Sequence, residues 1–179
     1  MPKCFHTIYH TPPEFDDLVL TGNDTTLFSL TFANSDGYKI HNQDISEEND
    51  LPIFKETAHW LDIYFSGHQP DFTPNFHIQN ATPFRQEVSE IMLTIPYGKV
   101  LTYGEIAKII AKKHGLKKMS AQAVGGAVGW NSICIIIPCH RVLGVNNSLT
   151  GYTGGIHNKQ SLLNLENLRV ENAQKISFY

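Results

Sequence analysis

Residues 66–83, SGHQPDFTPNFHIQNATP, limit how this chain can fold, because they are rich in Pro, Gly and Asn and show no helical or strand period. The two sides of this segment differ in charge. Residues 1–81 hold 3 Lys and Arg against 12 Asp and Glu, whereas residues 82–179 hold 11 against 5, so the net charges are −9 and +6. We interpret the segment as a linker and predict two domains, residues 1–80 and 81–179.

A half with a net charge of +6 indicates a domain that meets a polyanion, and chance segregation of charge is the alternative. The 179 residues suffice for one domain or two small ones with a real core. No signal segment is visible, and no apolar run approaches the roughly 20 residues that span a bilayer. We therefore expect an intracellular, cytoplasmic protein that does not bind membranes.

The first half of the sequence has the pattern of strands followed by a helix. The turn sequence Gly22-Asn23-Asp24 separates two short apolar segments, which predicts a hairpin. On the second strand, apolar residues alternate with Ser29 and Thr31, so this strand should bury one face only. Residues 51–65 carry apolar side chains at helical spacing, with Pro52 suited to the first turn. These features predict an α/β domain.

The second half has the pattern of helices. Thr82-Pro83 opens an apolar stripe that ends at Ile95. Thr102-Tyr103-Gly104-Glu105 is a capping-box sequence that starts a second helix through Ile106, Ile109 and Ile110. Ser120 precedes a third helix, AQAVGGAVG. A helix, a turn and a short helix in a basic half outline a helix-turn-helix. The fold class we predict is an α/β domain followed by a mostly α domain.

The third of these helices, residues 121–129, consists largely of small residues. Its adjacent glycines, Gly125 and Gly126, each cost about 1 kcal/mol in a helix relative to alanine. The cost is explained if a bulky partner must approach the helix closely, or if another helix packs tightly against it. The sequence of this helix alone does not favour one of these two explanations over the other.

Three cysteines, Cys4, Cys134 and Cys139, are an odd number, and no secretory signal accompanies them, which argues against a disulfide framework. No pair of cysteines or histidines has the spacing of a zinc site, and we interpret the nine histidines as scattered surface residues. We expect neither a metal nor another cofactor.

An apolar segment, residues 133–137, runs into Pro138 and then into Cys139, His140 and Arg141. Cys139 is either a small hydrophobic residue that closes a buried strand or a nucleophile. Cysteine attacks as its thiolate, so a nucleophile needs a nearby base and a group that orients the base. Neighbouring residues of a strand point to opposite faces, so Cys139 and His140 would cooperate only through a turn or a bridging water.

Glu166 is a candidate for the orienting group. Leu162 and Leu163 precede it by four and three residues in the last predicted helix, so Glu166 shares their apolar face. A buried carboxylate requires a charged or hydrogen-bonding partner, and an imidazole would serve. A salt bridge to a lysine at the rim is the alternative.

Residues 82–170 closely resemble the O6-alkylguanine-DNA alkyltransferases, also called methylated-DNA–protein-cysteine methyltransferases. The resemblance is carried by TPFRQEVSEIMLTIPYGKVLTYGEIAKII, SAQAVGGAVGWN, IIIPCHRV, TGYTGG and LLNLE. It implies a ribonuclease-H-like N-terminal domain, which the first half matches loosely. It also implies a single-turnover DNA repair protein that transfers a methyl or other alkyl group from O6 of guanine irreversibly to its own cysteine, with a minor activity on O4-alkylthymine.

The resemblance implies a role for each of five residues. Cys139 would accept the alkyl group, His140 would remove the thiol proton through a water molecule, and Glu166 would hold His140. Asn131 would brace the turn before the cysteine, and Tyr103 would help rotate the nucleotide out of the helix and donate a proton toward N3 of guanine. The target base must leave the stack because its O6 is otherwise inaccessible to the sulfur.

Further residues are implied to touch DNA or the base. Those implied to touch DNA are Ala121, Gln122, Ala123, Gly125, Arg141, Lys99, Lys117 and Lys118. Val142, Tyr152 and Thr153 would line the base pocket. The chain departs from the family at Gln122, where many members have an intercalating arginine, and at the bulky Trp130. We interpret Cys134 as a packing residue, because no base is evident beside it.

Three functions remain as hypotheses at this point. The favoured one is an alkyl-accepting repair protein, a monomer whose partner is double-stranded DNA containing O6-alkylguanine. The second is a damage-recognition module that binds alkylated guanine without repairing it, although such alkyltransferase-like proteins lack the cysteine. The third is a Cys-His hydrolase, which would require an oxyanion site and access for water.

Overall fold

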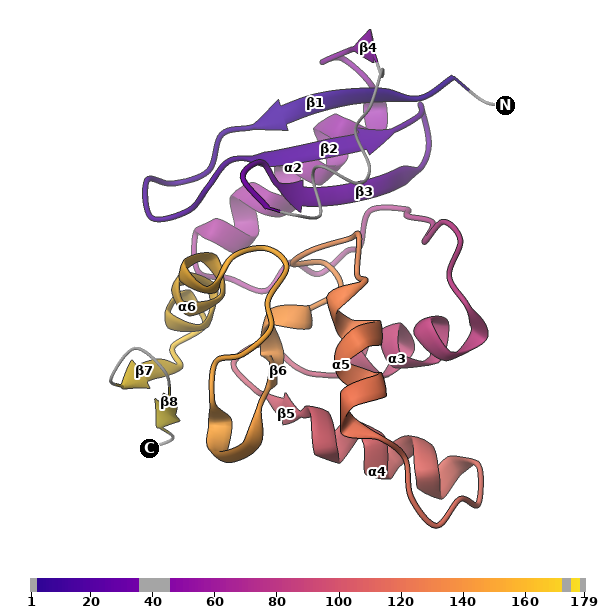
Figure 1. Cartoon of the computed structure of the whole chain (residues 1–179). Coiled ribbons are helices and arrows are strands. Elements are labelled where there is room, and N and C mark those ends of the chain that lie inside the picture. Colours follow the sequence, from indigo (N-terminus) through magenta and orange to yellow (C-terminus); the bar gives the residue numbers. More distant parts are fainter. Residues whose placement is uncertain (1–2, 36–45, 172–174, 178–179) are drawn as a thin grey trace.

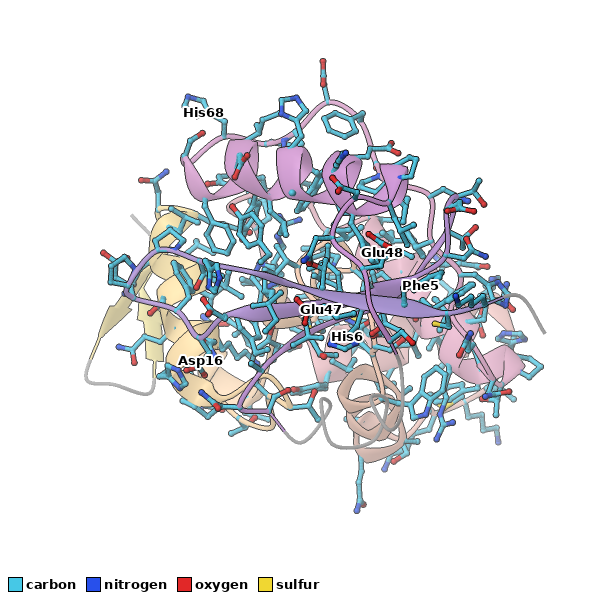
Figure 2. All side chains as sticks on the ribbon, turned by 90° about the horizontal axis from the view of Figure 1, so that it is seen from above. Phe5, His6, Asp16, Glu47, Glu48 and His68 are labelled. Atoms are coloured by element: carbon cyan, nitrogen blue, oxygen red, sulfur yellow. The ribbon has the colours of Figure 1, made fainter. Side chains whose placement is uncertain are left out.

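A four-stranded sheet lies above a helical half in the computed structural model, which describes residues 3–35, 46–171 and 175–177 (Figure 1). The strands β1 (Phe5–Tyr9), β2 (Leu18–Gly22) and β3 (Leu27–Phe32) are antiparallel neighbours, and β4 (Ser46–Glu47) runs parallel to β1. The order across the sheet is β3-β2-β1-β4. Figure 2 shows His6 of β1 beside Glu47 of β4, its register partner.

The predicted hairpin and the predicted helix of the first half are both confirmed. The side-chain oxygen of Asn23 accepts hydrogen bonds from the backbone of Thr25 and Thr26, at 3.0 and 2.9 Å, and so closes the turn between β2 and β3. The helix α2 (Pro52–Phe65) has Pro52 in its first turn and follows one face of the sheet (Figure 2). Its buried side includes Tyr64, which is important for the site described below.

The prediction that β3 buries only one face is wrong, because Ser29 and Thr31 are buried as well. The edge of β3 is covered by two segments from outside the sheet. The backbone of Leu27 exchanges hydrogen bonds with residues 75–77 of the predicted linker. The backbone of Leu30 exchanges hydrogen bonds with Ser132 and Cys134, both at 2.8 Å. The sheet edge is therefore used to hold the segment that leads to Cys139.

The helical half supplies the remaining elements. In chain order they are α3 (Pro83–Leu93), β5 (Leu101–Thr102), α4 (Tyr103–Lys113), α5 (Ala121–Gly129), the 3-10 turn η1 (Cys139–Arg141), β6 (Val142–Leu143), the 3-10 turn η2 (Val145–Asn147), α6 (Ile156–Leu165), β7 (Arg169–Glu171) and β8 (Lys175–Ser177). The strands β5 and β6 form a parallel pair, and β7 and β8 form an antiparallel pair.

The predicted helix starts of this half are confirmed. The side chains of Thr82 and Ser120 cap α3 and α5, and Thr102 forms a capping box with Glu105 at the start of α4. Of the three isoleucines of this helix, Ile106 and Ile110 are buried, whereas Ile109 is 42% exposed.

One apolar core connects the two halves. It joins Leu30 of the sheet and Leu61 of α2 with Ile133 of the loop before Cys139 and Leu162 of α6. Asp16 of the β1–β2 connection lies beside α6, where the side-chain amide of Asn158 donates to it at 2.9 Å (Figure 2). The halves are thus held in one relative position. Among the described residues, no helix is long and apolar enough to cross a membrane.

The substitution Thr102→Ala is expected to lower the free energy of unfolding by about 1 kcal/mol, because it removes the side-chain acceptor for the backbone amide of Glu105. Urea unfolding followed by circular dichroism measures the change. Thr102→Ser keeps the hydroxyl and is the matched control. An equal loss in both variants would contradict the capping role.

Candidate active site

The segment that leads to Cys139 is a tight turn, so the strand expected over residues 133–137 is not formed. Its central residue, Ile135, has a φ of 69°, which is unfavourable for a β-branched side chain. The Asn131 side chain holds this backbone in place. Its amide nitrogen donates to the carbonyls of Ile133 and Ile137, at 3.3 and 3.0 Å, and its oxygen accepts from the Ile133 amide at 3.0 Å. Asn131 therefore braces the turn.

Cys139 lies in a buried but polar environment. Its side chain is 1% exposed, and the Asn131 amide donates to its Sγ at 3.0 Å. Hydrogen bonds from the Cys134 thiol and from Asn131, together with the positive charge of Lys159, lower the pKa of Cys139 to about 7, although burial opposes the shift. A large fraction of this sulfur is therefore thiolate at neutral pH, unlike an ordinary cysteine.

Lys159, which our sequence analysis did not single out, is completely buried. Its Nζ donates to the carbonyls of Val142 and Thr150, at 2.7 and 3.2 Å. Burial lowers the pKa of Lys159 to about 8, while the charge of Cys139 opposes that shift, so the ammonium and the thiolate stabilise each other. Lys159 precedes Glu166 by seven residues and so shares its helix face. The spacing that indicated Glu166 could have indicated Lys159 too.

Glu166 is the centre of a buried hydrogen-bond network. Its Oε1 accepts from His140 Nε2 at 2.8 Å and from the Tyr64 hydroxyl at 2.7 Å. The Arg141 guanidinium donates to both carboxylate oxygens at 2.9–3.1 Å, and the backbone amide of Gly98 donates to Oε2 at 3.0 Å. The Glu166 carboxylate is therefore paired with an imidazole, which was one of the two predicted partners, and not with a lysine at the rim.

The network fixes the protonation of His140. Burial raises the pKa of Glu166, but the opposing effects of His140 and Arg141 are together stronger and hold it well below its usual range. Burial lowers the pKa of His140, so the ring is neutral at pH 7. The ionised carboxylate can only accept, so Nε2 carries the ring proton and Nδ1 has the free electron pair. Nδ1 is buried and has no protein partner among the described residues.

Cys139 and His140 are consecutive residues of η1, where neighbouring side chains are about 120° apart and not on opposite faces as in a strand. No direct hydrogen bond between their side chains occurs in the part of the chain that the structure describes. Nδ1 of His140 is therefore free to accept a proton through a water molecule.

Two residues that hold Glu166 were missed by the sequence analysis. Tyr64 comes from α2 and precedes Glu166 by 102 residues, so no local pattern could connect them. Gly98 has a φ of 70°, and a side chain there would approach the Glu166 carbonyl to 3.2 Å. Glycine is suited to this position for both reasons. The sheet-bearing half thus contributes directly to the site through Tyr64.

Tyr103 spans the space between α5 and the loop before α6. Its hydroxyl donates to the Thr150 carbonyl at 3.1 Å, and its ring faces Gly125, where a side chain would touch it. Burial, followed by the nearby charge of Cys139, raises the pKa of Tyr103 to about 12. The hydroxyl therefore keeps its proton at neutral pH. Tyr152 is buried near both Cys134 and Cys139, and Thr153 is half-buried.

The exposed face of α5 consists of Ala121, Gln122, Ala123 and Gly126, while Val124, Ala127 and Val128 pack against α3 and α4. No other helix of the described chain covers this face, so its small residues are not explained by helix packing. The predicted phosphate contacts Lys99, Lys117 and Lys118 are also exposed.

Arg141 is a correction to the expected DNA contacts. It is 6% exposed, and its guanidinium is engaged by Glu166 and by the Ile95 carbonyl, at 2.6 Å, so it holds the network instead. Trp130 stacks against Arg85 of α3, with 4.4 Å between the guanidinium carbon and the ring centre. Cys134 is buried, as expected of a packing residue, and its thiol also lowers the pKa of Cys139.

Chemically, the site offers an activated sulfur, a neutral imidazole with a free nitrogen, and a tyrosine that can donate a proton. This set suits a displacement in which the sulfur attacks a group brought to Cys139. Among the described residues, no group of three or more His, Cys, Asp or Glu side chains could hold a metal ion.

Two family models match the chain. The "6-O-methylguanine DNA methyltransferase, ribonuclease-like domain" matches residues 5–78, and the "6-O-methylguanine DNA methyltransferase, DNA binding domain" matches residues 83–168. The chain is 33% identical over 171 residues to the methylated-DNA–protein-cysteine methyltransferase of Haemophilus influenzae, covering 94% of this chain and 89% of the relative. It is 44% identical over 120 residues to that of Mycobacterium tuberculosis, covering 67% and 69%.

Solved structures agree with these matches. The O6-methylguanine methyltransferase of Mycobacterium tuberculosis superposes with a TM-score of 0.75 at 34% identity, covering 94% of this chain and 96% of the other. The structure of the Mycobacterium tuberculosis OGT in complex with DNA gives a TM-score of 0.76 at 34% identity, with coverages of 90% and 92%. The fold, with an N-terminal mixed sheet and a C-terminal helical part, is shared over nearly the whole chain.

Alkylation of Cys139 by iodoacetamide, without DNA, is expected to rise with pH with a midpoint near 7, because the thiolate is the reactive form. In Lys159→Met the midpoint should move upward toward 9, since the thiolate loses a neighbouring positive charge. The modified Cys139 peptide is measured by mass spectrometry, and Cys139→Ser provides the background. A midpoint unchanged in Lys159→Met would show that this ammonium does not act on the sulfur.

Proposed function

The chain belongs to the methylated-DNA–protein-cysteine methyltransferase family, and we propose that Cys139 is the cysteine that accepts the alkyl group. The protein is a DNA repair enzyme that transfers a methyl or other alkyl group from O6 of guanine in DNA to itself. The observation that carries the residue assignment is the lowered pKa of Cys139, about 7, beside a neutral imidazole held by a carboxylate. Asn131 and Lys159 stabilise the charged sulfur.

The reaction is an in-line displacement. His140 Nδ1 takes the thiol proton through a water molecule, and Glu166 holds the ring by its other nitrogen. The Cys139 sulfur then forms a bond to the alkyl carbon while the bond from that carbon to O6 breaks. The electron pair remains on guanine, which takes a proton at N3 from the Tyr103 hydroxyl. A thioether has no hydrolysis step, so each molecule acts once.

The damaged base must be rotated out of the duplex, because Cys139 is only 1% exposed and cannot reach a stacked base. We place the extruded guanine between Tyr103 and the loop that carries Tyr152 and Thr153. The carbonyl of Val142, which accepts a hydrogen bond from Lys159 Nζ at 2.7 Å, would face the exocyclic amine of the guanine. O4 of thymine, which presents an alkyl group in a similar position, is a minor substrate in this proposal.

The helix pair α4 and α5 acts as a helix-turn-helix that binds double-stranded DNA. The exposed small residues of α5 allow the backbone to approach the groove closely, and Gln122 occupies the space that the rotated base leaves. A Mycobacterium tuberculosis relative was solved in complex with DNA, which supports DNA as the partner. Lys99, Lys117 and Lys118 supply exposed charge for phosphates, which carries affinity without sequence preference.

The remaining parts of the proposal concern organisation. The sheet order β3-β2-β1-β4, with its parallel β1–β4 pair and α2 on one face, supports a ribonuclease-H-like arrangement for the N-terminal part. We place the boundary between the two domains at residues 80 and 81. We propose that the protein acts as a monomer in the cytoplasm and uses no cofactor.

Incubation with a duplex that contains one O6-methylguanine is expected to add one methyl group per protein chain, on the peptide that bears Cys139. Mass spectrometry of the digested protein measures the addition. Cys139→Ser should bind the duplex and remain unmodified. Binding by the native protein without a mass change would favour a recognition module, and repeated turnover on one molecule would favour a hydrolase.

Gly126→Leu is expected to weaken binding to duplex DNA by about tenfold, or roughly 1.4 kcal/mol, because the new side chain projects from the exposed face of α5. A Cβ at this position meets no atom within 4 Å, so the fold should tolerate it. Gly126→Ala is the matched control and should raise helix stability by about 1 kcal/mol. Fluorescence anisotropy with a labelled duplex measures affinity. Equal affinity of Gly126→Leu and the native protein would contradict close approach by this face.

A further inference from the structure

A second thiol contacts the one that the proposed function uses. The Cys134 side chain hydrogen-bonds with that of Cys139, and both are almost completely buried, at 2% and 1% exposed. The displacement reaction forms a bond to only one sulfur. Cys134 lowers the pKa of Cys139 but takes no part in that bond.

The backbone of the turn keeps these two sulfurs together. The Ile137 amide donates to the Ile133 carbonyl at 3.0 Å, which folds residues 133–137 back on themselves. The Asn131 amide nitrogen contacts the Ile133 carbonyl, at 3.3 Å, and the Cys139 sulfur, at 3.0 Å, so both ends of the turn meet at one group. Cys134 itself is anchored on β3, since its amide donates to Leu30 at 2.8 Å.

The hydroxyl of Tyr152 is a further polar group beside the two sulfurs. It is buried, and its side chain hydrogen-bonds with those of Cys139 and Cys134. The ring lies close enough to both sulfurs for their charges to act on the hydroxyl. The pair is therefore surrounded by a hydroxyl, an amide and the ammonium of Lys159, and not by aliphatic side chains alone.

We propose that Cys134 and Cys139 form a reversible disulfide when the protein meets hydrogen peroxide, and that this bond protects the acceptor sulfur from irreversible oxidation. The proposal rests on the proposed function only in naming Cys139 as the reactive thiol. Peroxide is much smaller than the purine that has to reach Cys139 in the proposed function, so a path for the base is also a path for peroxide.

The reaction has two steps. The Cys139 thiolate attacks one oxygen of the peroxide, which breaks the O–O bond, gives a sulfenic acid and releases hydroxide. The Cys134 sulfur then attacks the Cys139 sulfur, which forms the S–S bond and expels the oxygen as water together with the Cys134 proton. Two thiols lose two electrons in total, and one peroxide becomes two water molecules. Without Cys134, a sulfenic acid can proceed to sulfinic and sulfonic acids, which thiols do not reverse.

The disulfide would switch the repair activity off, since a sulfur in an S–S bond lacks the negative charge that makes a thiolate a strong nucleophile toward an alkyl carbon. A thiol reductant restores both sulfurs. A disulfide requires about 2.05 Å between sulfurs, and the two cysteines already lie in one turn whose ends meet at the Asn131 amide.

The test exposes the native protein to hydrogen peroxide and maps its peptides by mass spectrometry without reduction. A linked pair of peptides bearing Cys134 and Cys139, two hydrogens lighter than the free pair, is expected. Methyl transfer should be lost and then restored by dithiothreitol. Cys134→Ala should give no linked pair, acquire sulfinic and sulfonic Cys139 instead, and stay inactive after dithiothreitol. Cys134→Ser repeats the test with a different side-chain volume, in case the alanine variant is unstable.

Cys4→Ser is the matched control, because Cys4 lies on the sheet-bearing half and takes no part in the pair. It should behave as the native protein does. Irreversible loss of methyl transfer in the native protein, equal to that in Cys134→Ala, would overturn the proposal, as would a link that uses Cys4. If the native protein accepts the methyl group but never forms the disulfide, this inference fails and the proposed function stands. If the disulfide forms but the reduced protein accepts no methyl group, the proposed function fails and this inference stands.

Discussion

The carboxylate of Glu166 is a full negative charge removed from water, and burying such a charge costs several kcal/mol unless partners compensate for it. Three separate segments supply those partners: Tyr64 comes from α2, Gly98 from the turn after α3, and His140 and Arg141 from η1. The charge therefore holds together parts of the chain that are up to 102 residues apart. It also fixes the tautomer of His140, on which the proposed proton transfer depends.

The sulfur is prepared by a second constraint, the strained turn before Pro138. Ile135 adopts a positive φ that its side chain disfavours, at a cost of about 1–3 kcal/mol. The hydrogen bonds of Asn131 and the attachment to β3 hold this conformation. The sheet-bearing half is thus part of the site, because its edge strand holds the turn and its helix supplies Tyr64.

The two sulfurs and Lys159 show how a buried site can remain reactive. A thiolate in an apolar cavity would be protonated, since burial penalises the charged form. Here the Cys134 thiol, the Asn131 amide and the Lys159 ammonium oppose that penalty and lower the pKa of Cys139 to about 7. The same closeness that lets Cys134 donate to the thiolate also places it where a disulfide can form. One arrangement therefore supports both the repair chemistry and its proposed protection.

The sequence by itself determined the elements whose signals are local: the hairpin at Asn23, the capped helices at Thr82, Thr102 and Ser120, and the burial of Glu166. The motif around Cys139 also indicated the family. Only the tertiary structure decided which partners meet, because contacts between α2, η1 and α6 leave no periodic trace in the sequence. It moved Arg141 from DNA to the buried network, turned the expected strand into a loop, and placed Cys134 against Cys139. A pattern along the chain reports which side of an element is buried, whereas the identity of the neighbour depends on how the elements pack.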